Sequence, residues 1–386
     1  MASAHLVPNQ QRSTLEYKSE RDIVFVFGAG ASVSDGAPLQ QQLLPIIKNV
    51  LEGELAGAES VRLFMEFLQE NFDLSGNSFP SLESIFGYID YFLAKKESLG
   101  GTFSTHRISV IRDTFVRLIH YVIDKHSKET RGIYRNFWEK ISIGSRNVSV
   151  VTMNYDTILD EAFDILYARK ALIDYCIELM NYHGNSLTRQ FPWWSWDNPR
   201  GKVNIWDGKV PAPIKLIKIH GSLNWKFCNC CNQVLLTPWE TDIDMPTESF
   251  KGRIPPSIEN FDGEEFDLLC PLDGTKFDTF IVPPSHIKQL SHPTINMLLD
   301  EAAMEIRVAK RLVFVGYSFP EADVHIKALF KKNLRFPIPI IVVNPFLTPE
   351  IERNYRSLGS NCKFVPKTFD SFIEEDLESL VLECEI

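Results

Sequence analysis

The sequence has few cysteines, no excess of basic residues and no long apolar run, and each absence excludes a class of protein. Seven cysteines among 386 residues are a sparse and odd set, so a disulfide framework is not expected. The 40 Lys and Arg residues are outnumbered by 50 Asp and Glu, which gives a net charge of −10. This balance argues against direct nucleic-acid binding through a broad basic face. The 44% of hydrophobic residues is typical of a folded globular chain and excludes wholesale disorder.

No apolar segment marks the chain for export or for a membrane. The first 21 residues are polar and lack the apolar core of a signal peptide. The longest apolar run, around 337–343, has the length of a strand and falls short of the ~20 residues that cross a bilayer. We therefore expect a cytoplasmic protein with no membrane partner. Residues 1–21 are expected to form an N-terminal arm, either disordered or in contact with another subunit.

Short runs rich in β-branched and aromatic residues predict buried parallel strands. Segments with helical periodicity separate them, and this alternation is typical of an α/β fold. The five runs are Asp22–Phe27, Val148–Met153, Ile214–Ile219, Leu312–Val315 and Ile338–Val343. We therefore predict a doubly wound, mainly parallel Rossmann-like sheet within one domain over 22–386.

Two long intervals between the strands predict additional modules. After the first strand, apolar residues recur at helical spacing, which predicts a helical insertion over about 40–145. Residues of about 183–280 lose that periodicity and hold Gly, Pro, Trp and a group of cysteines. We expect a small, loop-rich cysteine module there. Its dense aromatic patch at 191–196 is expected to form a local core, with stacking on a nucleotide base as the alternative.

The residues that follow the strands are candidates for a ligand site, because strand carboxyl ends face the crevice of an open α/β sheet. The first strand is followed by Gly28, Ala29, Gly30 and Ser32, a turn that lets the backbone approach a pyrophosphate. The glycine fingerprint of dehydrogenases has its third glycine at the position of Val33. The turn therefore argues against a dehydrogenase that transfers hydride. A tight turn without a ligand is the alternative.

Further strand ends carry side chains suited to binding a sugar or moving a proton. Asn154 and Asp156 follow the second strand, where they can bond ribose hydroxyls or cap a helix. His220 ends the third strand and precedes a glycine, a place from which it can act as a general base near neutral pH. A purely structural histidine is the alternative. Phosphate or ribose could also be bound after the last two strands, by Gly316, Ser318 and Asn344.

The order of these motifs resembles that of the sirtuin family. A glycine turn, Thr-x-Asn-x-Asp, His-Gly, a cysteine group, Gly-x-Ser and a strand ending in Asn follow one another from about Asp22 to Phe364. The resemblance implies that NAD⁺ is the bound nucleotide and that Asn154 and His220 are catalytic, with His220 as the base. It places Asp156 on the nicotinamide ribose. The other implied cofactor contacts are Gly28, Ala29, Gly30, Ser32, Gly316, Ser318 and Asn344.

The cysteine group resembles the structural zinc site of sirtuins, which two C-x-x-C pairs form. Cys228 and Cys231 make one intact pair, whereas Cys270 is followed three positions later by Asp273. Three thiolates with Asp273 or Cys230 as the fourth ligand can hold zinc tetrahedrally. The alternative is a module that no longer binds metal.

Two departures from the sirtuin pattern argue against protein deacetylation. The segment 36–41 lacks the Asp-Phe-Arg that follows the glycine turn in deacetylating sirtuins. The stretch 279–285 stands where those enzymes pair with a peptide, and it contains two prolines that cannot donate backbone hydrogen bonds. The strings at 316–323 and 282–284 resemble bacterial sirtuin-like effectors of anti-phage defence, which hydrolyse NAD⁺.

The resemblance therefore implies an NAD⁺ hydrolase that releases nicotinamide and ADP-ribose. A protein deacylase or ADP-ribosyltransferase is one alternative, and a non-catalytic module that senses NAD or ADP-ribose is another. Only about 40 residues follow the last motif, so we expect no sensor domain, and gating by oligomerisation or a separate protein. Proteins of this size resemble those paired with a HerA-type hexameric ATPase. A homo-oligomer with such a partner is expected, and any contact with DNA would belong to the partner.

Overall fold

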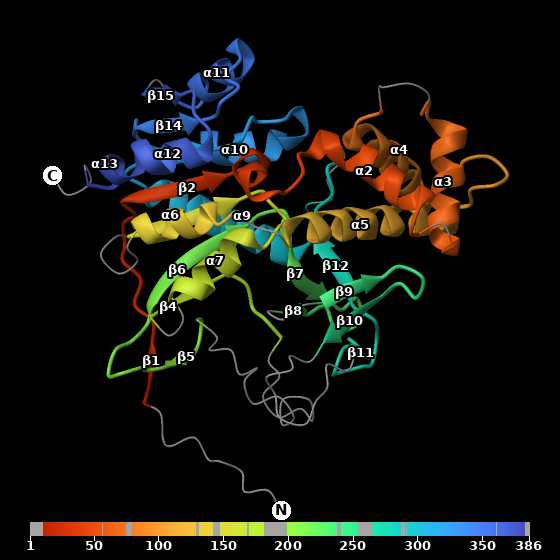
Figure 1. The fold of residues 1–386 in the computed structure, drawn as a ribbon, viewed down its shortest axis with the longest axis horizontal. Coiled ribbons are helices and arrows are strands. Elements are labelled where there is room, and N and C mark those ends of the chain that lie inside the picture. Colours follow the sequence, from red (N-terminus) through yellow and green to blue (C-terminus); the bar gives the residue numbers. More distant parts are fainter. Residues whose placement is uncertain are drawn as a thin grey trace, which may run out of the picture.

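Seven parallel strands form the central sheet, in the order β15-β14-β13-β2-β3-β6-β4 (Figure 1). Every neighbouring pair is parallel, which confirms the predicted doubly wound parallel sheet. The strands are β2 (Ile23–Phe27), β3 (Val148–Thr152), β4 (Ala171–Asp174), β6 (Ala212–Lys218), β13 (Leu312–Val315), β14 (Ile340–Val343) and β15 (Cys362–Val365). The computed structural model describes residues 11–55, 57–74, 79–128, 131–141, 147–167, 170–180, 199–237, 241–253, 265–286, 290, 292–359 and 361–382.

The five predicted runs are all central strands, and the sequence pattern misses only β4 and β15. Both of these lie at an edge of the sheet, where one side of the strand has no neighbouring strand among the described residues. Their burial is incomplete, so their sequences lack the continuous apolar character of the central strands.

Helices cover both faces of the sheet, because alternate residues of a strand point to opposite faces. Phe25 and Phe27 pack edge to face on Phe137, with ring centroids 5.0 and 5.3 Å apart. On the other face Phe314 contacts the rings of Phe330 and Tyr355. The first face carries α6 (Ile133–Ile141), α7 (Ile158–Tyr167), α12 (Phe369–Glu375) and α13 (Leu377–Leu382). The second carries α9 (Pro293–Val308), α10 (Val324–Asn333) and α11 (Pro349–Arg356).

Four helices between β2 and β3 form a separate bundle beside the sheet, on the right of Figure 1. They are α2 (Gln40–Glu52), α3 (Glu59–Asn71), α4 (Leu82–Lys95) and α5 (Thr105–Ser127). The side chains of Ser81 and Ser104 accept hydrogen bonds from backbone N–H groups of the first turns of α4 and α5, which fixes where these helices begin. The range predicted for the insertion, about 40–145, also contains α6, whose Phe137 packs on Phe25 and Phe27 of the sheet instead.

The described residues from 199 to 286 form short strands and turns around the cysteines. One antiparallel sheet has the order β12-β7-β8 and another the order β11-β10-β9. Their strands are β7 (Gly221–Phe227), β8 (Val234–Leu236), β9 (Thr241–Asp244), β10 (Ser249–Arg253), β11 (Glu265–Asp267) and β12 (Asp278–Ile281). Some apolar residues of these strands, such as Leu235 and Phe250, share a core with the four-helix bundle. Others, such as Trp225 and Phe280, belong to the core of the central sheet. The aromatic patch predicted at 191–196 lies outside the described residues.

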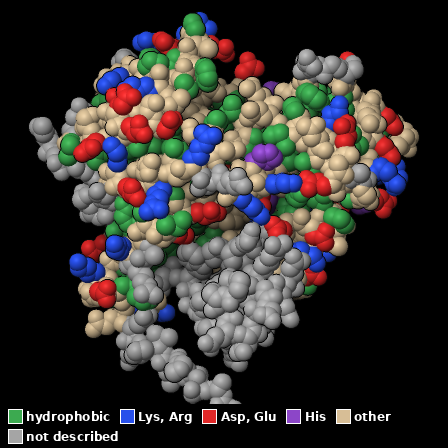
Figure 2. Space-filling model, in the orientation of Figure 1, with side chains coloured by type: hydrophobic (Ala, Val, Ile, Leu, Met, Phe, Trp, Pro, Cys, Tyr) green, Lys and Arg blue, Asp and Glu red, His purple; other side chains and the backbone are tan. Residues whose placement is uncertain are grey.

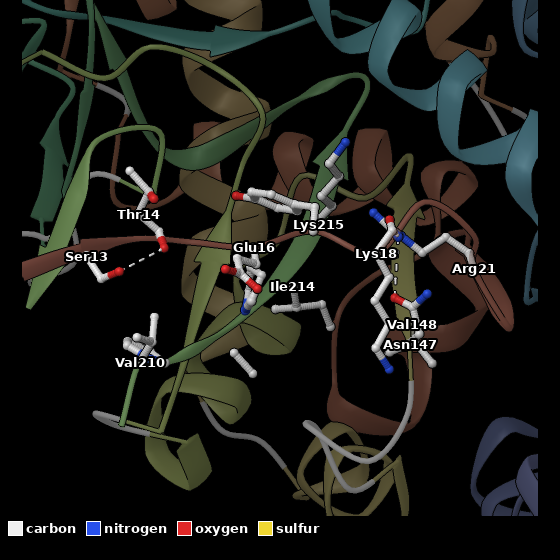
Figure 3. A pocket seen from close by; sticks show the side chains of 14 residues that line it. Ser13, Thr14, Glu16, Lys18, Arg21, Asn147, Val148, Val210, Ile214 and Lys215 are labelled. Atoms are coloured by element: carbon white, nitrogen blue, oxygen red, sulfur yellow. Dashed lines mark hydrogen bonds between the residues drawn. The ribbon is translucent and has the colours of Figure 1, made fainter. Parts of the chain in front are cut away.

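The described part of the N-terminal arm is ordered against the rest of the chain. Strand β1 (Arg12–Thr14) pairs antiparallel with β5 (Lys202–Asn204). The arm then lines a cavity of about 380 Å³ at the amino ends of β3 and β6, with Lys18 and Arg21 among its walls (Figure 3). Residues 1–10 lie outside the described part of the chain.

Ion pairs beside this cavity tie the arm to the sheet and to α9. Arg21 lies 2.6 Å from Glu305, and both side chains are almost fully buried. Lys215 of β6 lies 3.0 Å from Glu305 and 2.9 Å from Glu301. Arg200 lies 2.8 Å from Glu301 and completes the chain of charges. Each buried charge therefore has an oppositely charged neighbour, which offsets the cost of removing it from water.

Replacing Glu305 with glutamine should destabilise the fold, because Arg21 would keep its buried charge and lose its anion. We expect Glu305→Gln to lower the free energy of unfolding by about 3 kcal/mol, measured by urea denaturation. Glu20→Gln is the matched control, since Glu20 pairs with Lys310 on the surface, and we expect it to cost less than about 1 kcal/mol. Equal small losses for the two variants would show that the buried network is dispensable.

The surface of the described chain carries mixed charge. On the face drawn in Figure 2, acidic and basic side chains are interspersed, without a broad basic area. No helix among the described residues is both long and apolar enough to cross a membrane.

Candidate functional site

The strand order reverses between β2 and β13, and a large cavity lies at their carboxyl ends. From β2 the chain proceeds to β3 on one side, whereas from β13 it proceeds to β14 on the other. Such a switch point leaves a crevice above the sheet, because the loops diverge in opposite directions. The cavity there has a volume of about 950 Å³, close to the upper end of the range typical of ligand sites.

Most residues singled out from the sequence meet in this cavity. Four different strand ends and the glycine turn contribute to it, although these segments are far apart in the chain. The lining residues from the predicted set are Ala29, Gly30, Asn154, Asp156, His220, Gly316, Ser318 and Asn344. The other two, Gly28 and Ser32, lie behind the wall. The structure therefore brings the predicted set together in one place.

The glycines allow two turns to pack against each other. A Cβ atom on Gly28 or Gly30 would lie 2.7 or 2.8 Å from the carbonyl oxygen of Gly316, closer than atoms can approach. Gly316 itself has φ +63°, a left-handed conformation that favours glycine. The Gly30 N–H donates to the Gly316 carbonyl at 3.0 Å. The turn after β2 is thus held directly on the turn after β13.

This packing changes the interpretation of the glycine turn. The sequence suggested a helix N-terminus facing a pyrophosphate, but α1 (Ala29–Ser32) has only four residues and continues as a 3₁₀ turn over Val33–Asp35. So short a helix has little dipole, and the N–H of Gly30 is already engaged. Close packing of the turns accounts for the glycines, while Ala29 and Gly30 still form part of the cavity wall.

Ser32 organises the polar groups behind the wall. Its hydroxyl lies 3.0 Å from the Asn154 Nδ2 and 2.9 Å from the Tyr134 hydroxyl. Asn154 Nδ2 also donates to the Gly28 carbonyl at 3.1 Å. The Asp35 carboxylate accepts the backbone N–H groups of Tyr134 and Ile133, which anchors the start of α6. The amide of Asn154 is therefore held in one orientation at the cavity.

Asp156 is a buried carboxyl group on the same wall. Its side chain is 6% exposed, and burial raises the pKa of this carboxyl group, opposed by the nearby Lys218 ammonium. Lys218 donates to the Asp156 carbonyl oxygen at 2.6 Å and lies 3.2 Å from an Asp160 carboxylate oxygen. Keeping Asp156 ionised without a ligand therefore costs stability, a pattern that is common at binding sites.

Asp156→Asn should stabilise the ligand-free protein at neutral pH. Because the folded-state pKa lies above the unfolded value, the ionised carboxylate costs folding free energy as pH rises through that interval. We expect the melting temperature of the variant at pH 7 to exceed that of the wild type by a few degrees. The gain should shrink as pH falls toward the ordinary carboxyl range, because both states then bind the proton. A lower melting temperature for the variant at pH 7 would contradict this account.

His220 has two partners that the sequence did not identify. Its Nε2 lies 3.1 Å from the Nε2 of His325 and 3.9 Å from an Asp323 carboxylate oxygen. Asp323 ends the 3₁₀ turn Glu321–Asp323, and His325 is the second residue of α10. Asp323 belonged to the motif after β13, but its closeness to His220 depends on how β6 and α10 pack. No spacing in the sequence reveals that contact.

The four-helix bundle covers one side of the cavity. The starts of α2 and α4 supply lining residues, including Leu39, Gln40 and Glu83. The Gln40 side chain donates a hydrogen bond to Glu83 across this side. The segment 36–41, which lacks the deacetylase pattern, lies here. Near the other end of the cavity, Asn344 Oδ1 accepts the backbone N–H of Phe346 at 2.9 Å, so the Asn344 side chain shapes the loop after β14.

The cysteines form a separate cluster, on two turns with matching backbone geometry. The fifth residue of each turn donates its N–H to the carbonyl of the first, Asn232 to Cys228 at 2.8 Å and Gly274 to Cys270 at 2.7 Å. Both donors have positive φ, 57° and 74°. Asp273 therefore occupies in the second turn the position that Cys231 occupies in the first.

Ligand atoms of Cys228, Cys231, Cys270 and Asp273 lie within 4.8 Å of one another. Two sulfurs bound to a tetrahedral zinc lie about 3.8 Å apart, and Cys231 and Cys270 have their sulfurs at 3.8 Å. The Cys228 sulfur lies 3.3 Å from an Asp273 oxygen. Exposed Cys230 is not part of the group. The cluster can hold zinc through three thiolates and the Asp273 carboxylate.

Purified protein should contain about one zinc per chain, held by this cluster. We expect Cys270→Ser and Asp273→Ala to lower the zinc content, measured by inductively coupled plasma mass spectrometry, and to lower the melting temperature because the two turns lose their cross-link. Cys230→Ser should leave both quantities unchanged. If Cys230→Ser lost zinc and Asp273→Ala did not, the assignment of the fourth ligand would be wrong.

Comparison with known proteins gives distant structural matches only. No family model matches the sequence, and no curated protein matches it. A Sir2 homologue solved with NAD is 13% identical, with 97% of each chain covered and a TM-score of 0.41. A mutant Sir2 homologue bound to ADP-ribose is 14% identical over 94% of this chain and 91% of that one, with a TM-score of 0.38. Sir2Tm bound to a propionylated peptide is 14% identical over 93% of each chain, with a TM-score of 0.41.

At these identities and TM-scores the matches do not assign the chain to a family. The strand order and register define the class of the protein. It is a doubly wound parallel α/β fold with a helical insertion, a cysteine module and a cavity at the switch point.

Proposed function

We propose that the chain is a sirtuin-like enzyme that hydrolyses NAD⁺ to nicotinamide and ADP-ribose. The observation that carries the proposal is the cavity of about 950 Å³ at the switch point, which is lined by Asn154, Asp156 and His220 together with residues of two glycine-bearing turns. These are the residues that the motif order in the sequence singled out. A dinucleotide is an extended ligand, and an extended crevice above the carboxyl ends of β2, β3, β6 and β13 suits it.

The arrangement suits cleavage of the bond between nicotinamide and ribose. Loss of nicotinamide leaves positive charge on the ribose ring, so the enzyme must hold the sugar and direct a nucleophile at its anomeric carbon. Asp156 would bind the ribose hydroxyls, and Asn154, fixed by Ser32 and Gly28, would orient the attacking water. His220 would accept the proton released as that water adds.

The edge of β12 favours water over a peptide as the acceptor. The N–H of Val282 donates to the His220 carbonyl at 2.8 Å, and its carbonyl accepts the Tyr155 hydroxyl at 2.6 Å. Both backbone groups are therefore used within the protein, and the next two residues are prolines without an N–H. A substrate peptide has little backbone to pair with there, which disfavours the deacylase alternative.

His220→Ala and Asn154→Ala should each lower nicotinamide release from NAD⁺ by at least ~100-fold, because each removes a group that acts on the reacting water or sugar. For the wild type, product analysis by liquid chromatography should show ADP-ribose and nicotinamide in equal amounts. No ADP-ribose should be transferred to protein or to an acetylated peptide. His106→Ala is the matched control, since His106 is exposed on α5, and it should keep wild-type activity. Unchanged release in the His220→Ala variant would rule the assignment out.

We further propose that the enzyme acts as an anti-phage effector, silent until a partner releases it. The strings at 316–323 and 282–284 support this by their resemblance to defence effectors. A homo-oligomer bound to a HerA-type hexameric ATPase is the assembly we propose. Co-expression with the candidate ATPase and size-exclusion chromatography would test it. Co-elution in a large complex is expected, and separate elution of the two proteins would contradict the pairing.

A further inference from the structure

Two histidines and a carboxylate converge on one point of the cavity wall. The Nε2 atoms of His220 and His325 lie 3.1 Å apart, and an Asp323 oxygen lies 3.9 Å from the Nε2 of His220. The ligand atoms of all three residues lie within 4.8 Å of one another. His220 follows β6, whereas Asp323 and His325 sit at the start of α10. Packing of these two elements, rather than a sequence motif, assembles the group.

We propose that His220, Asp323 and His325 form a binding site for a divalent transition-metal ion such as Zn²⁺ or Co²⁺. Two imidazoles and one carboxylate are a donor set that suits these metals, whereas Mg²⁺ and Ca²⁺ prefer oxygen ligands throughout. Metal bonds of about 2.1 Å in tetrahedral geometry place ligand atoms about 3.4 Å apart. The two imidazole nitrogens, 3.1 Å apart, lie slightly closer than this, and the Asp323 oxygen, 3.9 Å from His220, lies slightly farther. Small side-chain movements would therefore bring these donor atoms to metal-binding spacing.

A hydrogen bond between the two imidazoles would explain only part of this arrangement. Such a bond needs two nitrogens and one proton, but here a third donor atom, from Asp323, approaches the same point. Asp323 is 6% and His220 5% exposed. A metal ion bound by all three side chains would bring the three donor atoms to one point.

A neighbouring hydrogen bond orients one of the three donor side chains, as is usual around metal sites. The Tyr317 hydroxyl donates to the second carboxylate oxygen of Asp323 at 2.8 Å, and Tyr317 is itself buried. This bond fixes the carboxylate so that its other oxygen faces His220, the role that outer hydrogen bonds play for metal-binding carboxylates. His220 and Asp323 also line the cavity, so a bound ion would keep a coordination position open toward the ligand.

The consequence for activity rests on the proposed function. His220 Nε2 offers one lone pair, which can accept a proton in catalysis or bind a metal, but not both. A bound ion would therefore silence the hydrolase by occupying its base. This site is distinct from the cysteine cluster, whose thiolates belong to two turns of the other module.

Cobalt titration of the purified full-length chain tests the site without reference to activity. Protein that retains its own zinc is titrated with Co²⁺ and followed by visible absorption. Saturation of a visible band at one added equivalent, without the near-ultraviolet band of cobalt–thiolate bonds, is expected. His325→Gln should weaken Co²⁺ binding at least tenfold, and His106→Gln should not. Absence of the visible band, or an unchanged affinity in both His325→Gln and Asp323→Asn, would overturn the proposal.

A second measurement tests the effect on NAD⁺ hydrolysis. Zn²⁺ added to the wild type should inhibit nicotinamide release, and EDTA added in slight excess of the Zn²⁺ should restore it. In His325→Gln the Zn²⁺ concentration for half inhibition should rise at least tenfold. Cobalt binding with undiminished hydrolysis would overturn the silencing role and leave the site in place. If the wild type hydrolyses no NAD⁺, the cobalt titration still decides the site, so failure of the two proposals can be told apart.

Discussion

The contact between the turns after β2 and β13 is the constraint on which the rest of the structure depends. Gly28, Gly30 and Gly316 leave no room for a side chain between the two turns, and the Gly30 N–H closes the contact with a hydrogen bond. The two halves of the sheet are thereby joined at the place where the strand order reverses. Any side chain here would push the turns apart and separate the two sides of the cavity.

Hydrogen bonds between polar groups behind the cavity connect these two turns to the neighbouring elements. Ser32, one turn beyond Gly28, connects to Asn154 of the next strand and to Tyr134 of α6. On the other side Tyr317, directly after Gly316, holds Asp323 beside His220. These buried groups satisfy one another, so each side chain has one favoured orientation. Burial raises the pKa of the Asp156 carboxyl group, so keeping Asp156 ionised costs stability.

The cavity lies between two hydrophobic cores that different elements form. The sheet and its helices form one core, and the four-helix bundle shares the other with the cysteine module. Leu43 and Leu44 of α2 belong to the second core and also line the cavity. Cys228 and Cys270 belong to this second core too. A zinc ion on the cysteines would thus stabilise the layer that covers the ligand site, although no zinc ligand lines that site.

The sequence by itself determined the parallel sheet and most of the cavity residues, because buried central strands read as apolar runs and their carboxyl ends must meet at one edge. It could not determine the edge strands β4 and β15, whose half-exposed residues lack that pattern. It predicted that Gly30 contacts a pyrophosphate, and the structure adds that Gly30 packs against Gly316. Only the tertiary structure decided that Asp273, rather than Cys230, faces the thiols. It alone placed His325 beside His220, because contacts between residues some hundred positions apart depend on how β6 and α10 pack.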